Sequence, residues 1–392
     1  MMRARLIMRI SGVLVIAVAA LLAVTTLVTA KPDPVIKGTE LVLTFLVHRH
    51  GDRTPVESTI AFSNNPTELR ELSAPYGLGQ LTNVGKQRAY KLGEHIRSRY
   101  EELLRPQYNR SEVFIRSTDS TRAKMTALAS LAAVYPPGES SWSQQLRWTP
   151  VPYTTVPVKY DFNTAFANCP VFMEMYTGYF TKPYPSMDKY KEVLTMLSSH
   201  VGIDLNTYFG RLMLVYDVFV SQLSMGLPLD PEIQKQFSLI QEAAGKSFDL
   251  IFGNESYIDL QAGVLLNEFF KKAGAVIAGN DTQRLRIYSG HDFNVYSFEA
   301  VTQISNRQGV PKYASAYALE LRKVVKSGKY VVLPVYLPEP GAPVKYLQIK
   351  GCSQLCDLNK FRKITAQYVL DEDTWRTKCG FNKDMEIDES GI

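Results

Sequence analysis

The sequence predicts an α/β fold built on a mixed, largely parallel sheet with helices on its faces. Three observations support this prediction. The run Leu41–Val47 is apolar at almost every position, which is typical of a strand buried on both faces. Strand-like and helical stretches then alternate along the chain, whereas residues 163–244 show helical spacing alone. We therefore expect an α/β domain of residues 31–162 and 245–392, interrupted by an inserted, mainly helical domain at 163–244.

The first elements follow from apolar spacing and capping residues. Thr82 is a suitable N-cap for an amphipathic helix at Asn83–Tyr100. A short strand at Glu112–Arg116 leads into a helix at Thr121–Val134, whose expected inward-facing positions are Met125, Leu128 and Leu131. The later predicted elements are a helix at Glu255–Ala278, a strand at Arg284–Ser289, a helix at Phe293–Gln303, a hairpin of Tyr317–Val325 and Tyr330–Leu337, and a strand at Val344–Ile349.

Residues 1–30 have the pattern of a secretory signal peptide. Arg3, Arg5 and Arg9 precede the apolar run Ile10–Val28, and a cleavage site of the Val-Thr-Ala type ends at Ala30. A signal anchor is the alternative, because the run approaches the ~20 residues that span a bilayer. Cleavage predicts a secreted or lysosomal protein without stable membrane association.

The composition indicates a globular protein that does not bind nucleic acid. The 392 residues are 45% hydrophobic and 21% charged, which excludes wholesale disorder. The formal net charge of +6 falls to +3 when the three arginines of the signal peptide are removed. The sequence contains no dense basic block, so nucleic acid is not an expected partner.

Four cysteines and three sequons suit an exported glycoprotein. Cys352 and Cys356 are close enough to pair across a turn, which leaves Cys169 with Cys379; this is one of three connectivities that four cysteines allow. A zinc site at the C-x₃-C pair is the alternative, although no second pair of Cys or His lies nearby. The candidate glycosylation sites are Asn109, Asn254 and Asn280.

Reactive side chains gather at the ends of three predicted strands. Ligand sites of α/β sheets lie at the carboxyl ends of strands, so we expect these side chains to converge in one crevice. Three guanidinium groups directed at one point would bind a tetrahedral oxyanion such as a phosphoryl group. The residues concerned are Arg49, His50, Arg53, Arg116, His291 and Asp292.

The same set supplies the groups needed to hydrolyse a phosphate monoester. A neutral imidazole is a competent nucleophile toward phosphorus, and a carboxylic acid can protonate the departing alcohol. The reaction would pass through a phosphohistidine and would require neither a metal nor another cofactor.

Three motifs resemble those of one enzyme family. The stretch Arg49–Pro55 (RHGDRTP) resembles the RHGxRxP signature of the histidine acid phosphatases, branch 2 of the histidine phosphatase superfamily. Ile115–Asp119 and Ser289–Asp292 are similar to the two other motifs of that family and occur in the same order. Further similarity to the prostatic and lysosomal type extends from Glu40 to Cys379 and includes Gln80–Thr82, Asn168–Pro170 and the pair Cys352 and Cys356.

The resemblance implies a role for each of the six residues. His50 would become phosphorylated, and Asp292 would protonate the leaving group and then activate water. The inserted helical domain would cover the carboxyl edge of the sheet. Small-molecule and peptide phosphate monoesters are both implied as substrates, and homodimers occur in this group. Phytases and lysophosphatidic acid phosphatases share the motifs, so the substrate stays open. The implied phosphate-binding residues are Arg49, Arg53, Arg116 and His291.

Neighbouring polar residues are expected to be structural. His48 stands where relatives usually carry an aromatic residue, and we expect it to pack near the site without acting in it. His95 and His200 lie in helical stretches and are expected to have no catalytic role. The other expectations are that Asp52 and Thr54 shape the loop, that Asp119 caps the next helix, and that Arg122 and Lys124 are solvated.

Two other functions are compatible with parts of the pattern. A metal-dependent hydrolase would use His48 and His50 as ligands together with His291 and Asp292, but the arginines would oppose a cation. A secreted anion- or lipid-binding protein would have no need of all six reactive residues. Turnover that resists EDTA would favour the phosphatase over both.

Overall fold

The computed structural model describes residues 35–63, 65–138, 142–143, 145–185 and 187–387. Residues Gly38–Ile392 form one compact unit by their contacts. The predicted signal peptide and its cleavage site lie outside the described residues. No helix in the described part of the chain is both long and apolar enough to cross a bilayer.

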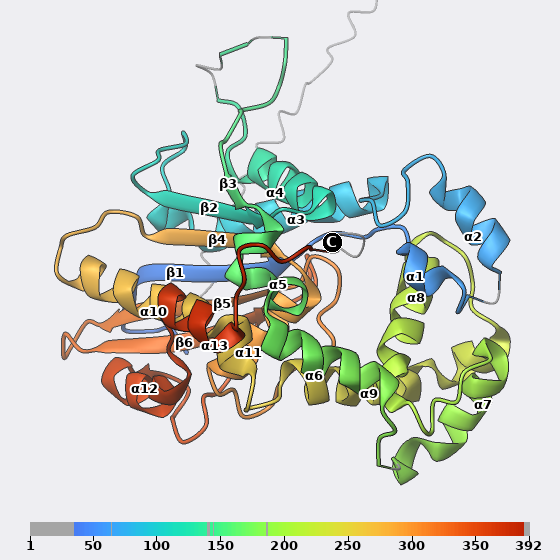
Figure 1. The fold of residues 1–392 in the computed structure, drawn as a ribbon. Helices are drawn as coiled ribbons and strands as arrows, with labels where there is room; N and C mark the ends of the chain where they lie inside the picture. Colours follow the sequence, from blue (N-terminus) through green and yellow to red (C-terminus); the bar gives the residue numbers. More distant parts are fainter. Residues whose placement is uncertain (1–34, 64, 139–141, 144, 186, 388–392) are drawn as a thin grey trace, which may run out of the picture. The chain divides into compact units, whose positions relative to one another are not determined.

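A mixed sheet of eight strands lies at the centre of this unit (Figure 1), which confirms the predicted fold class. The strand order is β3-β2-β4-β1-β5-β6-β7, and β8 pairs with β6. β1 is parallel to β4, as β2 is to both β4 and β3, whereas β5 to β8 are antiparallel additions. The strands are β1 (Thr39–Arg49), β2 (Val113–Thr118), β3 (Thr154–Val156), β4 (Leu285–Gly290), β5 (Ala316–Val324), β6 (Tyr330–Leu337), β7 (Lys345–Tyr346) and β8 (Cys356–Asp357).

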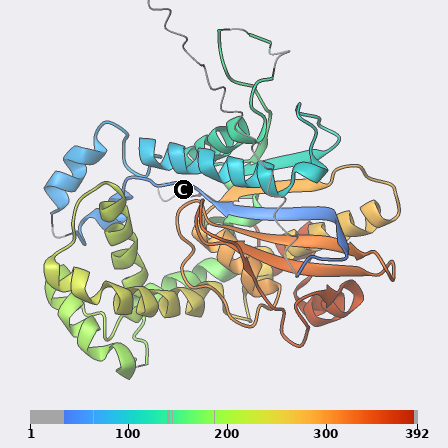
Figure 2. The same ribbon diagram turned by 180° about the vertical axis from the view of Figure 1, so that it is seen from behind.

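Helices cover both faces of the sheet. Figures 1 and 2 show α3 and α4 on one face and α10 and α11 on the other. The helices are α1 (Glu57–Ile60), α2 (Pro66–Ser73), α3 (Asn83–Arg99), α4 (Thr121–Val134), α5 (Ala165–Asn168), α6 (Pro170–Thr181), α7 (Lys191–Val201), α8 (Leu212–Ser224), α9 (Pro231–Phe252), α10 (Ile258–Ile277), α11 (Asp292–Val301), α12 (Leu358–Thr365) and α13 (Glu372–Cys379).

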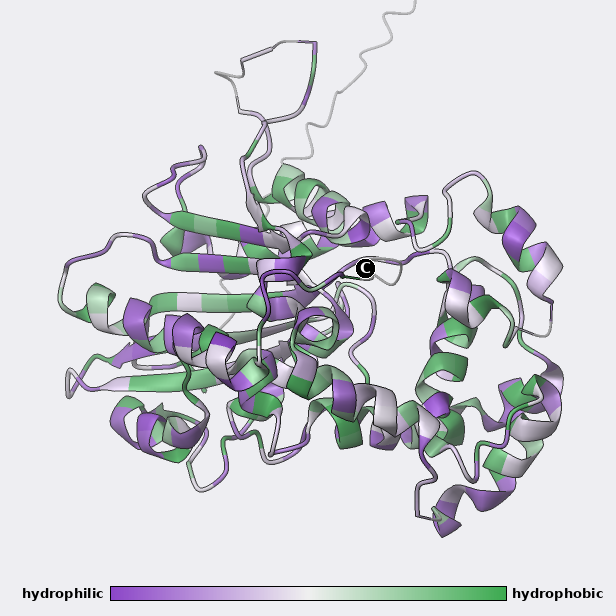
Figure 3. Ribbon diagram, in the orientation of Figure 1, coloured by the Kyte–Doolittle hydropathy of each residue, from purple (hydrophilic) through white to green (hydrophobic). Residues whose placement is uncertain are grey.

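Strand β1 is buried on both faces because its side chains alternate between the two layers. Phe45 packs against Phe269 of α10 and Phe298 of α11. Leu46 belongs to the cluster on the opposite face, together with Ile96 of α3. Figure 3 shows hydrophobic residues along much of the central sheet, which agrees with this double burial. The predicted two-sided strand at Leu41–Val47 is therefore confirmed.

The helices α3 and α4 lie at the expected places, but of the predicted inward residues of α4 only Leu131 is buried. Thr82 caps α3 by accepting a hydrogen bond from the Gly85 amide at 3.1 Å. Leu128 is 38% exposed, and α4 turns smaller residues inward. A Cβ atom at Gly93 of α3 would lie 2.0 Å from the Ser130 carbonyl oxygen, so the two helices approach too closely for larger side chains. Small residues therefore decide which face of α4 is buried.

The helices between α5 and α9 are held by two different cores. Phe172 of α6 belongs to the main core beneath the sheet, whereas Leu194 of α7 and Val215 of α8 belong to a separate apolar cluster. The disulfide Cys169–Cys379 joins the N-terminus of α6 to the last residue of α13, and Cys352 is bonded to Cys356. The boundaries proposed for an inserted domain, 163 and 244, stay a prediction.

Candidate active site

The ends of β1 and β4 bring the two histidine motifs together. Arg49 pairs with Gly290 in the parallel register, and the His50 amide donates to the Gly290 carbonyl at 2.9 Å. His50 also accepts a backbone hydrogen bond from Ala314 at 3.0 Å. The imidazole rings of His50 and His291 consequently lie with their centroids 5.5 Å apart.

Glycine allows the loop after β1 to turn toward α3. A Cβ atom at Gly51 would lie 2.3 Å from the Gly85 carbonyl oxygen, a distance that no larger residue could tolerate. Asp52 accepts a hydrogen bond from the Thr82 amide through its carbonyl oxygen, and Thr54 donates its hydroxyl to Gly77 at 2.7 Å. Both residues shape the loop, as expected.

His50 is a buried, neutral imidazole with a defined orientation. Nδ1 lies 2.8 Å from the Gly51 carbonyl oxygen, which assigns the proton to Nδ1 and leaves the lone pair on Nε2. Burial lowers the pKa of His50 well below its ordinary value of 6.5, and the charges of Arg122 and Arg49 lower it further. The imidazole that the sequence predicts to be the nucleophile is therefore neutral, with its lone pair on Nε2.

Three arginines line one cavity of about 450 Å³ together with His50 and His291. Arg49 donates to the Pro311 carbonyl at 2.7 Å and stacks over the ring of Tyr313 at 4.3 Å. Arg53 donates to the Ser221 hydroxyl at 3.2 Å. The third arginine is Arg122, which is 5% exposed and lies 3.5 Å from Nδ1 of His291.

The structure places two arginines differently from what the sequence predicted. Arg122 was expected to be solvated, yet it is buried beside both histidines. Arg116 was expected in the phosphate-binding set, yet it does not line the cavity and donates to Asp161 at 2.6 Å. Arg116 lies within β2, two residues before the strand ends, whereas Arg122 lies in the first turn of α4 and points back toward the sheet edge.

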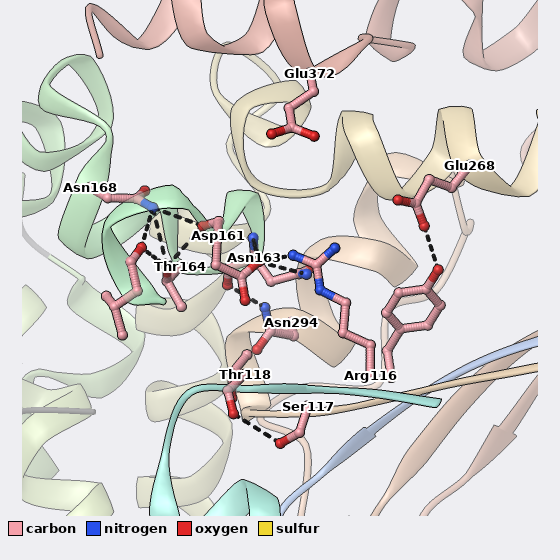
Figure 4. A network of polar contacts seen from close by, with 12 residues as sticks. Arg116, Ser117, Thr118, Asp161, Asn163, Thr164, Asn168, Glu268, Asn294 and Glu372 are labelled. Carbon is pink, nitrogen blue, oxygen red and sulfur yellow. Dashed lines mark hydrogen bonds and ion pairs between the residues drawn. The ribbon is translucent and has the colours of Figure 1, made fainter. Parts of the chain in front are cut away.

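Arg116 nevertheless reaches the site through a chain of hydrogen bonds (Figure 4). Asp161 accepts from Arg116 and also from the Asn163 amide at 2.9 Å. The Asn163 carbonyl accepts from Asn294 at 2.7 Å, and the Asn294 side chain accepts from the His291 amide at 2.9 Å. The network fixes the backbone at the start of α11, where His291 and Asp292 lie.

His291 is the N-cap of α11, and Asp292 is the first residue of this helix. Nε2 of His291 lies 3.1 Å from the Thr118 hydroxyl, which can donate or accept. Burial lowers the pKa of His291 well below 6.5, and Arg122 lowers it further. Asp292 is partly exposed in the cavity and lies 2.8 Å from Nη2 of Arg49. A carboxyl group thus stands beside an arginine and across from the proposed nucleophile.

Asp217 of α8 is a site residue that sequence reasoning missed. It lines the cavity and accepts a hydrogen bond from Nη2 of Arg53 at 2.7 Å. No local pattern distinguishes it from other polar residues of a helix. Only the packing of α8 over the sheet edge brings it to the arginines.

The remaining polar residues have structural contacts. His48 is fully buried, lies outside the lining of the cavity, and bonds to the Arg49 carbonyl at 3.1 Å. Burial lowers its pKa to about 4, as it does for His95. Asp119 is ion-paired with Lys124, and α4 has no side-chain cap, so the expected capping role of Asp119 is wrong.

The geometry does not assemble the alternative metal site at His48 and His50, because His48 does not line the cavity. Within the described ranges, the one group of three side chains close enough to share an ion is His200, Asp230 and Glu232. That group is distant in sequence from all three motifs and contributes nothing to the cavity lining.

The outer wall of the cavity is mainly apolar. Among the described residues that line the cavity, the basic ones are Arg49, His50, Arg53, Arg122 and His291. Helices α6, α8 and α9 supply most of the wall. The wall includes Phe166, Met173, Tyr176, Met213, Leu214, Tyr216, Val220, Phe248, Phe252, Phe293 and Val310.

Comparison with known proteins points to one family. Residues 40–211 match the family model described as histidine phosphatase superfamily (branch 2). The prostatic acid phosphatase of Bos taurus is 33% identical over 357 residues, covering 88% of this chain and 89% of that protein. The lysosomal acid phosphatase of Xenopus laevis is 30% identical, covering 92% of this chain and 83% of that protein.

Solved structures show the same fold at lower sequence identity. The phytase of Klebsiella sp. ASR1 superposes with a TM-score of 0.62 at 13% identity, covering 88% of this chain and 100% of the phytase chain. The apo phytase of Hafnia alvei gives a TM-score of 0.60 at 15% identity, covering 88% and 98% of the two chains. These likenesses concern the arrangement of the sheet and helices.

Proposed function

The chain belongs to branch 2 of the histidine phosphatase superfamily, and we propose that it is an acid phosphatase that hydrolyses phosphate monoesters through a phosphohistidine at His50. The observation that carries this proposal is one cavity that three arginines line together with a buried histidine whose Nε2 keeps its lone pair. Such a site binds a phosphoryl group and presents a nucleophile to it in the same place.

In the first step, Nε2 of His50 attacks phosphorus while Arg49, Arg53 and Arg122 bind the non-bridging oxygens. Asp292, in its protonated form, gives its proton to the oxygen of the departing alcohol, so that the alcohol leaves uncharged. His291 contributes a further polar contact to the phosphoryl group. Phosphorus exchanges its bond to the ester oxygen for a bond to nitrogen.

In the second step, the carboxylate of Asp292 takes a proton from water, and the water oxygen attacks the phosphohistidine. The bond between phosphorus and Nε2 breaks, and its electron pair returns to the imidazole. Inorganic phosphate leaves, and both catalytic residues regain their starting protonation. Acidic pH suits this cycle because Asp292 must begin protonated while the depressed pKa of His50 keeps the imidazole neutral.

The apolar outer wall favours alcohols with aromatic or alkyl groups as the part that leaves. A phytase would need further cations to bind the remaining phosphates of its substrate. The cavity lining offers none beyond the arginines and histidines already used for one phosphoryl group. We therefore propose apolar phosphate monoesters, including lysophosphatidate and phosphotyrosine peptides, ahead of inositol phosphates.

The test is to trap the intermediate. Purified protein is mixed with a ³²P-labelled aryl phosphate in EDTA and quenched in base, in which phosphohistidine survives. We expect label on the native protein and none on His50→Ala, whose turnover should fall by about 10³-fold or more. His200→Ala, at an exposed position on α7, is the control and should label normally. Full labelling of His50→Ala would overturn the assignment.

We also propose that the protein enters the secretory pathway and is secreted or lysosomal. The N-terminal pattern and two disulfides support this. Of the three sequons, Asn280 is exposed, while Asn109 and Asn254 are partly exposed, so all three are reachable by a glycan. A homodimer remains a proposal from the resemblance, and sedimentation of the purified protein would test it.

A further inference from the structure

Asp217 brings a second carboxylate to the phosphate end of the cavity, and the reaction described above does not use it. Its Oδ1 atom accepts from Nη2 of Arg53 at 2.7 Å and lies 4.0 Å from Nη2 of Arg49. The carboxylate therefore contacts two of the three arginines assigned to the phosphoryl oxygens.

The other oxygen of this carboxylate is unsatisfied. Oδ2 of Asp217 is buried and has no hydrogen-bond partner among the described residues. A buried carboxylate oxygen without a donor is costly, so a donor is expected from what the cavity binds. A phosphoryl dianion offers only acceptor oxygens, which would oppose Asp217. A monoanion carries one P–OH group, which can donate.

We propose that Asp217 makes the site select the singly protonated form of the phosphoryl group, by accepting the P–OH hydrogen bond at Oδ2 while Oδ1 holds Arg53. The inference rests on the proposed function and adds a specificity-determining residue to it. The proton stays on the phosphoryl oxygen during binding, so the selection makes and breaks no covalent bond.

The charge of Asp217 weakens the preference of the cavity for a dianion. Three arginines face two carboxyl groups, and Asp292 is protonated when the ester binds, so Asp217 lowers the net charge of the cavity from three to two. The histidines add none, because burial keeps both neutral. Besides Asp292, the charged and titratable groups that face Asp217 are Arg49, Arg53, Arg122, Tyr176, Tyr216 and Tyr313.

Inhibition by two inorganic anions tests the proposal. Near pH 5, inorganic phosphate is a monoanion with P–OH groups, whereas sulfate is a dianion without a proton. Hydrolysis of p-nitrophenyl phosphate is measured at increasing concentrations of each anion, which gives one inhibition constant for phosphate and one for sulfate. The native protein should bind phosphate at least about tenfold more tightly than sulfate, and Asp217→Asn should reduce that ratio about tenfold.

Asp249→Asn is the matched control. Asp249 also forms an ion pair with an arginine, Arg307, but it lies outside the lining of this cavity. This variant should leave the ratio unchanged. A second readout is the fall of kcat/KM above the second pKa of the ester, which is about 6. This decrease in kcat/KM should occur at higher pH in Asp217→Asn and at the native pH in Asp249→Asn.

Each remaining outcome is decisive. An equal loss of affinity for both anions in Asp217→Asn would mean that Asp217 only positions Arg53, and would overturn the proposal. Equal affinities of the native protein for phosphate and sulfate would overturn it without any variant. If neither anion competed with substrate, the proposed phosphate site itself would be wrong, which separates the two failures.

Discussion

Arg116 donates to Asp161 at 2.6 Å, and this ion pair lies at one end of a hydrogen-bonded chain that ends at the backbone of His291. The guanidinium therefore stabilises the active site from outside it. Arg122, six residues further along, lies in the cavity itself. The two arginines should respond differently to the same substitution.

Arg116→Ala should mainly lower stability, and Arg122→Ala should mainly lower activity. Removing Arg116 leaves the fully buried Asp161 unpaired, at a cost of about 3 kcal/mol in the free energy of unfolding. Burial already raises the pKa of Asp161, so the penalty should be larger at pH 7 than at pH 4. Arg122→Ala should lower kcat/KM by about 10–100-fold. Urea denaturation and steady-state kinetics measure the two effects, and a reversed pattern would contradict the site as described.

Asp292→Asn should slow the enzyme according to its leaving group. A phenolate whose conjugate phenol has a low pKa can leave without being protonated, whereas an alkoxide must be protonated to leave. The variant should therefore lose about 10²–10⁴-fold in kcat on an alkyl phosphate and much less on p-nitrophenyl phosphate. Comparing kcat on the two substrates checks this. Equal losses would assign the proton to another group.

Arg122→Gln should move the acidic limb of the pH profile to higher pH. Burial is the largest cause of the low pKa of His50, and the charge of Arg122 is the next. Removing that charge lets His50 take up a proton at higher pH, which inactivates the nucleophile. The measurement is the pH dependence of kcat/KM between pH 3 and pH 7. Lys124→Gln, on the same helix, is the control. An unmoved limb would show that another group governs it.

His48→Phe should change how stability depends on pH. The folded pKa of His48 is about 4 against 6.5 for the free side chain, so the unfolded chain binds the extra proton between those values. The native protein should lose stability as pH falls from 6.5 toward 4, and the variant should lose less. Denaturation at pH 7 and pH 4.5 gives the difference. Identical losses in both proteins would contradict the buried neutral histidine.

The sheet and the histidine motifs could be predicted because their signals are local. Leu41–Val47 has the apolar pattern of a doubly covered strand, and His50 and His291 directly follow strands whose register brings them together. Asp217 could not be predicted, since its place depends on how α8 packs against residues more than 160 positions away. Arg122 had a usable signal, which is that the first turn of a helix after a strand lies at the carboxyl edge.

The position of β1 in the sheet also has a consequence during synthesis of the chain. Both neighbours of β1 are strands from the C-terminal third, β4 and β5. Ribosomes add about 5–20 residues per second, so on the order of 10–50 s pass between the synthesis of β1 and the synthesis of either neighbouring strand. During that time an apolar segment with two unpaired edges is exposed to other nascent chains. Chaperone binding to Leu41–Val47 would protect the strand that later leads into the proposed phosphate site.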